Sequence, residues 1–224
     1  MDSYMDYTSP SAQFTYDLKD NVLFQKDAQN YINELSIQQL NTLANISLLD
    51  IYLSTANVVE PHYHQNAAEL VYCVSGAVTV SLINPFTREL HHFPLIPGQV
   101  ANVPQGWWHY EVATMDHTHL IAIFNAPIPE FILGSDILRL TPSNILAHTY
   151  CLNENKIQAA LAPIKKPVII GPPNDCKHQQ AKKPGIHVRL ADTPPHLQAA
   201  PERTYAPTNG YPGLSFNNGL STQN

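Results

Sequence analysis

The sequence predicts an all-β protein built as a jelly-roll barrel, followed by short helices. Residues 46–124 consist of short runs rich in β-branched and aromatic residues, separated by Asn, Pro and Gly. Eight such runs at regular spacing are typical of a barrel or a jelly roll. The expected strands lie near 46–53, 57–63, 68–75, 77–83, 89–95, 99–103, 108–114 and 118–124.

Two helices are expected after these strands. Ser143 can cap a helix near 143–149, and Asn153 can cap a second helix near 154–161. The second helix carries three apolar residues that we expect to face the core, and both helices are expected to pack on the outside of the barrel. These residues are Ile157, Ala160 and Leu161.

The chain of 224 residues is long enough for one barrel-sized domain with extensions. We expect a polar N-terminal arm over 1–20, the barrel over 21–125 and a helical extension packed on it over 126–166. The remaining segment, 167–224, contains nine of the 19 prolines and few large aliphatic residues. This composition predicts a largely disordered tail.

Composition also limits the partners. Charged residues make up 13% of the chain and the formal net charge is −6, so no basic surface is available for nucleic acid. No apolar run approaches the ~20 residues of a membrane helix, and the first residues lack a basic start and an apolar stretch. We therefore expect a cytoplasmic protein without nucleic-acid or membrane partners.

Three histidines and one glutamate form the most informative pattern. His62 and His64 are two apart on an expected strand, so both can point into the barrel. Glu69 begins the next strand, and His109 follows a turn at 104–106 that returns the chain to the same place. This donor set suits Mn(II), Fe(II), Co(II), Ni(II) or Zn(II), and it leaves two positions open on an octahedral ion.

The spacing His-x-His-x4-Glu-x6-Gly over 62–76, followed by Gly-x5-Pro-x-Gly-x2-His over 98–109, resembles the two motifs of the cupin superfamily. The resemblance covers residues 46–125. It implies a cupin double-stranded β-helix with the same three histidines and glutamate as metal ligands. The sequence departs from the pattern at Ala56, where the first motif normally has Gly, and at Ala113, where germins often have Asn.

Beyond the ligands, segments 124–127 and 143–149 resemble oxalate decarboxylases and their single-domain relatives. That resemblance implies manganese, dioxygen and a small carboxylate substrate. It also implies an Arg before the first His that holds the carboxylate, and a Glu on the loop after the last strand that supplies a proton. The first position is Val59 here, which cannot pair with a carboxylate, and the second corresponds to Glu130.

Three functions are compatible with this sequence. The first is a manganese-dependent decarboxylase or oxidase of a small carboxylate, with Glu130 or, less directly, Glu60 handling a proton. The second is a non-enzymatic cupin that binds or senses a small carboxylate, and the third is an iron-dependent dioxygenase. The family resemblance further implies a homodimer or a homohexamer. A second metal site at His117 and His119 is weighed against ordinary packing, because no carboxylate has the spacing of the main motif.

Overall fold

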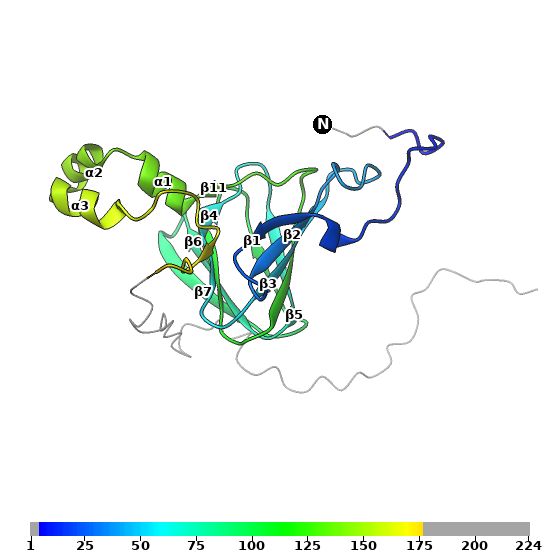
Figure 1. Ribbon diagram of the computed structural model, residues 1–224, viewed down its shortest axis with the longest axis horizontal. Coiled ribbons are helices and arrows are strands. Elements are labelled where there is room, and N and C mark those ends of the chain that lie inside the picture. Colours follow the sequence, from blue (N-terminus) through cyan, green and yellow to red (C-terminus); the bar gives the residue numbers. More distant parts are fainter. Residues whose placement is uncertain (1–4, 177–224) are drawn as a thin grey trace, which may run out of the picture.

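The computed structural model describes residues 5–176, which form two antiparallel sheets facing each other as a barrel (Figure 1). The first sheet contains, in spatial order, β1 (Val22–Gln25), β2 (Tyr31–Leu35), β3 (Ser47–Leu53), β10 (Thr118–Phe124), β5 (Glu69–Ser75) and β8 (Val100–Val103). The second contains β11 (Ile132–Leu133), β4 (Val58–Tyr63), β9 (His109–Ala113), β6 (Val78–Asn84) and β7 (Glu89–Leu95), and β12 (Ile170–Gly171) also pairs with β4.

The predicted all-β fold is confirmed, and the eight expected strands correspond to β3 through β10. Side chains alternate as a barrel requires; along β5, for example, buried and exposed residues alternate from Glu69 to Val74. The inward residues of both sheets form one apolar core. Its fully buried members include Leu53, Val71, Val80, Leu120 and Phe124.

Four strands were not anticipated. β1 and β2 extend the first sheet beyond β3, and β1 has no buried residue that could reveal it through alternation. β11 and β12 are two residues long and both pair with β4, so they depend on a tertiary contact rather than on a local pattern.

The pairing of β4 with β9 contains a bulge. Val59 lies opposite Glu111 and His62 lies opposite His109, so three residue steps on β4 match two on β9. Pro61 falls within this bulge. Proline has no backbone N–H, and at a bulge this costs no hydrogen bond between the strands. As a result, Val59 and His62 both face the barrel interior although they are three apart.

Two of the turn residues with positive φ bear on the cupin pattern. Gly76, between β5 and β6, has φ 71°, and a Cβ there would lie 2.6 Å from the Cα of Thr118, so this site requires glycine. Ala56 has φ 67°, and its N–H donates to the carbonyl oxygen of Ala113. The two departures from the cupin pattern are therefore neighbours, and Ala56 occupies a conformation that favours glycine.

Three α-helices follow the barrel, and a single 3₁₀ turn, η1 (Leu18–Asp20), precedes it. Helix α1 (Gly134–Leu140) contacts β4 and β11, whereas α2 (Ser143–Tyr150) and α3 (Glu154–Leu161) contact each other and project from one side (Figure 1). Asn153 caps α3 as predicted, because its side chain accepts a hydrogen bond from the N–H of Lys156. Ser143 does not cap α2; the capping position is Pro142.

The expected packing of α3 on the barrel is wrong. This helix has no buried residue: Ile157 and Leu161 are half-buried and Ala160 is exposed. Instead, α3 contacts α2, the helix that precedes it in the sequence, so the two short helices pair with each other.

The expected tail also begins too early. Ile170 is 1% exposed and β12 joins the barrel, because the short apolar run at 168–170 pairs with β4 despite its proline-rich surroundings. The rest of the expected tail, 177–224, and residues 1–4 of the expected arm lie outside the described residues. Among residues 5–176, no helix is long and apolar enough to cross a membrane.

Candidate metal centre

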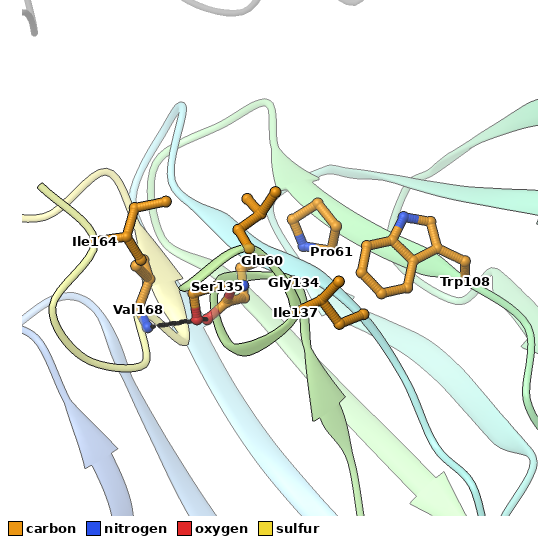
Figure 2. Close-up of a pocket in the computed structure, with 9 residues that line it drawn as sticks. Glu60, Pro61, Trp108, Gly134, Ser135, Ile137, Ile164 and Val168 are labelled. Carbon is orange, nitrogen blue, oxygen red and sulfur yellow. Dashed lines mark hydrogen bonds between the residues drawn. The ribbon is translucent and has the colours of Figure 1, made fainter. Parts of the chain in front are cut away.

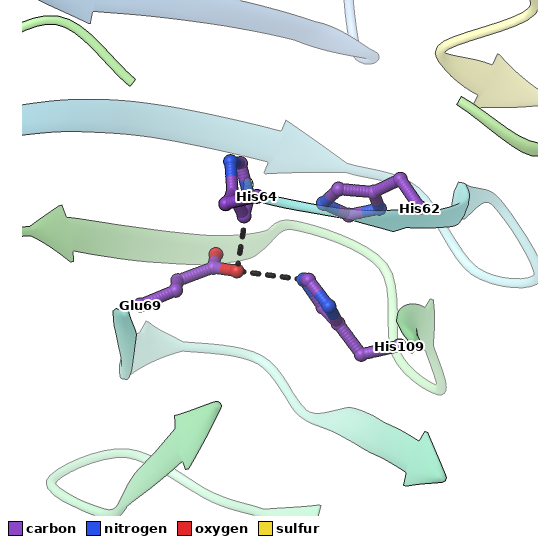
Figure 3. A group of neighbouring side chains, drawn as sticks. All are labelled: His62, His64, Glu69 and His109. Carbon is purple, nitrogen blue, oxygen red and sulfur yellow. Dashed lines mark hydrogen bonds and ion pairs between the residues drawn. The ribbon is translucent and has the colours of Figure 1, made fainter. Parts of the chain in front are cut away.

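The four side chains expected to hold a metal converge inside the barrel (Figure 3). His62 comes from β4, His64 from the residue after it, and Glu69 and His109 from the first positions of β5 and β9. Their candidate donor atoms all lie within 4.8 Å of one another, and the four residues are 0–5% exposed. A small, enclosed site with three imidazoles and one carboxylate results.

Each imidazole is oriented by a backbone carbonyl. The Nδ1–H of His62 donates to Glu60 at 2.6 Å, that of His64 to Glu130 at 2.9 Å and that of His109 to Trp107 at 2.8 Å. These bonds place a proton on each Nδ1, so that Nε2 is the atom of each ring that can bind a metal; on His109, a metal would have to displace the proton that Nε2 shares with Glu69. This is the arrangement in which protein histidines bind metals.

Glu69 supplies the negative charge of the cluster. Its Oε2 lies 2.8 Å from His109 Nε2 and 3.4 Å from His64 Nε2 (Figure 3). Burial opposes ionisation of Glu69, but hydrogen bonding and the charge of His109 outweigh it and hold the pKa of Glu69 well below its ordinary value.

The histidines respond differently to burial. Burial, together with the charge of His109, lowers the pKa of His62 to about 3, so this imidazole is neutral and available as a donor. Burial would also lower the pKa of His109, but the hydrogen bond and charge of Glu69 raise that pKa to about 9. A divalent cation in the cluster would compete with this proton for His109 and Glu69.

The residues present fit a divalent transition metal. His64 Nε2 is buried and has no hydrogen-bond partner among the described residues, which an ion between the rings would supply. Mixed imidazole and carboxylate donors match the borderline metals Mn, Fe, Co, Ni and Zn. In the described chain, these four residues are the one group of at least three potential ligands that could hold an ion.

Glu130 contacts the site through its backbone. Its carbonyl oxygen orients His64 and its N–H donates to the side chain of Asn66, while its exposed carboxylate accepts a hydrogen bond from Gln65 at 3.0 Å. The predicted proton donor thus lies on the loop next to the metal centre, with its carboxylate directed toward Gln65.

Glu60 does not face the metal centre. Behind the bulge, its carboxylate accepts hydrogen bonds from the N–H and hydroxyl of Ser135 and from the N–H groups of Val168 and Ile169. Figure 2 shows this side chain between β4, the start of α1 and the segment leading to β12, beside a pocket of about 360 Å³. The hypothesis that Glu60 handles a proton is wrong, since the bulge turns it away from His62.

Two residues at the centre were missed. Asn66 bridges the turn after His64 to the following loop, accepting from Glu130 N–H and donating to the carbonyl of Ile128. Glu111 is 1% exposed and its Oε1 lies 3.7 Å from His109 Nε2. The spacing His109-x-Glu111 on one strand was the available signal. Burial, with the nearby charge of Glu69, raises the pKa of Glu111 to about 8.

The suggested second metal site near the end of the barrel does not form among the described residues. His119 Nε2 bonds Asp50 Oδ1 at 2.6 Å and its ring stacks on Tyr52. His117 is exposed in the preceding turn, so the two histidines do not share a ligand position.

Comparison with known proteins agrees with this geometry. A model of the cupin family matches residues 19–158. Nectarin-1 of Nicotiana langsdorffii x Nicotiana sanderae is 27% identical over 146 residues, covering 60% of this chain and 61% of that protein. Germin-like protein subfamily 2 member 1 of Arabidopsis thaliana is 30% identical over 123 residues, covering 53% and 55%. The chain thus matches less than two thirds of the length of either relative.

Solved structures show the same fold at low sequence identity. Oxalate decarboxylase from Bacillus subtilis superposes with a TM-score of 0.62 at 19% identity, covering 72% of this chain and 43% of that one. Procruciferin, an 11S globulin from Brassica napus, gives a TM-score of 0.67 at 20% identity, covering 74% and 44%. With the family match spanning more than half of the sequence, this chain belongs to the cupin family and carries its buried metal-binding group of three histidines and one glutamate.

Proposed function

We propose that this cupin binds one Mn²⁺ ion and acts on a small carboxylate. One observation carries the metal assignment: three backbone carbonyls fix three Nδ1 protons, which leaves three Nε2 atoms and Glu69 directed at one point. Such orientation of buried donors is costly to assemble unless the donors have a partner.

The protein residues contribute binding, orientation and enclosure. When bound, the metal supplies a Lewis acid and a template for an oxygen-rich anion. His62, His64, Glu69 and His109 would hold it, and their burial limits competing water. Glu130, on the adjacent loop, would hold the proton of a decarboxylation after releasing Gln65. In that reaction the bond between two carboxyl carbons breaks, carbon dioxide leaves, and the remaining carbon takes the proton.

A second candidate is a cupin that binds a small carboxylate without turning it over. Val59 faces the barrel interior at 8% exposure, where the resemblance to oxalate decarboxylases implies an arginine. Without a guanidinium, a carboxylate gains neither the paired hydrogen bonds nor the charge that would orient it for reaction. This observation favours binding over catalysis on oxalate itself.

Elemental analysis of the purified wild-type protein and of Glu69→Gln tests the metal assignment, with Ile145→Ala, on the distant α2, as the matched control. We expect stoichiometric manganese in wild type and control, and its loss in Glu69→Gln. Iron with oxygen consumption on an aromatic or thiol substrate would favour the dioxygenase alternative. Oxalate is then supplied to the loaded protein: formate and carbon dioxide support the enzyme, and binding without products supports the second candidate.

We further propose that the chain forms a homodimer or a larger homo-oligomer through the outer face of the first sheet. Leu70, Tyr72 and Val74 of β5 and Val100 of β8 are 37–52% exposed there and adjoin half-buried Ile121 of β10. A contiguous apolar sheet face of this kind favours association with a second copy.

A cytoplasmic location, without nucleic-acid or membrane partners, stays a prediction from composition.

A further inference from the structure

Glu111 differs from the other buried carboxylates of the described chain. Asp50 accepts hydrogen bonds from His119 and Asn33, Glu60 accepts four, and Glu69 accepts one from His109. Neither carboxylate oxygen of Glu111 has a hydrogen-bond partner in another described residue, although the residue is 1% exposed. A carboxylate in this position requires a partner that the protein itself does not provide.

Its surroundings identify where that partner would lie. Glu111 follows His109 by two positions on β9, so both side chains face the barrel interior. Its neighbours across the sheet are Val59 and Val80, which are buried and apolar. Nε2 of His109 lies 3.7 Å from its Oε1. The carboxylate therefore lies between two apolar strand partners and within 4 Å of a residue of the metal centre.

Distance and charge are both compatible with coordination. Two donors bound to one ion at about 2.1 Å can be up to about 4.2 Å apart, so 3.7 Å from His109 Nε2 falls within reach. Three neutral imidazoles add no charge, and Glu69 alone leaves a divalent ion with one uncompensated positive charge inside the barrel. A second carboxylate makes the buried centre neutral, which lowers the cost of burying it.

We propose that Glu111 is the second carboxylate ligand of this metal centre and takes one of the positions left open by His62, His64, Glu69 and His109. Since no hydrogen bond from another described residue holds the carboxylate, rotation about its side-chain bonds can bring it onto the ion. The inference rests on the proposed metal binding and extends it. It leaves one open position rather than two, and a neutral centre that favours a singly charged ligand over a dianion.

Manganese titration of the full-length chain tests this proposal, with affinity measured by competition with a chelator and by the electron paramagnetic resonance of the bound ion. Glu111→Gln keeps the shape and removes the charge, and Glu111→Leu also removes the oxygen donors. We expect both to lower Mn²⁺ affinity about 10–100-fold, with an altered spectrum. Val80→Ala disturbs the adjacent core without touching charge and should keep wild-type affinity.

Thermal unfolding with and without Mn²⁺ separates coordination from packing. We expect metal-free Glu111→Leu to be at least as stable as the metal-free wild type, and the stabilisation by Mn²⁺ to shrink in both variants. Equal Mn²⁺ affinity in wild type and both variants, with Glu69→Gln defective, overturns this inference alone. A wild type that binds no Mn²⁺ overturns it together with the proposed function.

Discussion

His64 is oriented by a carbonyl group that lies 66 positions away in the chain. The loop that carries this carbonyl is tied to the His64 turn by Asn66, whose amide bonds both Ile128 and Glu130. Gln65 reaches the same loop but contacts only the carboxylate of Glu130. One ligand of the metal centre thus depends on an amide side chain that touches neither the metal nor a substrate.

We therefore expect Asn66→Ala to lower Mn²⁺ affinity about tenfold, because the carbonyl that orients His64 loses its anchor. Gln65→Ala is the matched control and should keep wild-type affinity, since it releases only the side chain of Glu130. Chelator competition measures both. Equal affinities for Asn66→Ala and Gln65→Ala would show that this amide does not support the centre.

Ala56 has positive φ at a position where the family pattern has glycine. A non-glycine residue with positive φ destabilises the folded state by about 1–2 kcal/mol. Glycine removes this strain, but it also increases the conformational entropy of the unfolded chain, which offsets part of the stabilisation. We expect Ala56→Gly to raise the free energy of unfolding by about 0.5–1 kcal/mol. Ala77→Gly, where φ is not positive, should lower it by a similar amount, and denaturant unfolding compares the two.

At the scale of elements, the sequence predicts what repeats locally. Alternating apolar residues and turn residues predict eight strands, and the spacing of three histidines and one glutamate predicts that their side chains converge. Both are found in the structure. The positions of Glu60 and β12 do not follow, because the bulge at Pro61 changes which side chains face inward and β12 exists only by pairing with β4. Glu111 was overlooked for a related reason: a glutamate looks solvated until the strand partners on both sides are known.

Strand β12 gives a direct test of how far the folded unit extends. Ile170 is 1% exposed against β4, so we expect Ile170→Ala to lower the free energy of unfolding by about 2–5 kcal/mol. Ile145→Ala removes the same atoms from an exposed site on α2 and should change stability by less than about 0.5 kcal/mol. Similar values from denaturant unfolding would mean that residues 167–176 do not contribute to the barrel.

For the whole molecule, the apolar outer face of the first sheet governs association. We expect Tyr72→Arg to convert an oligomer into monomers, because a guanidinium in the centre of this face would be buried without a partner. Phe86→Arg places the same charge on an exposed turn between β6 and β7 and should leave the molar mass unchanged. Light scattering after size exclusion gives both masses, and an intact oligomer in Tyr72→Arg would contradict this interface.

Glu60 joins the two sides of β4. Its backbone carbonyl accepts the Nδ1–H of His62 inside the barrel, while its carboxylate holds the N–H groups of Val168 and Ile169 outside. Any ligand that steadies His62 therefore also steadies the segment leading to β12. The amides of Val168 and Ile169 become reporters of occupancy: their hydrogen–deuterium exchange should slow when Mn²⁺ is added, although neither residue belongs to the group of candidate ligands.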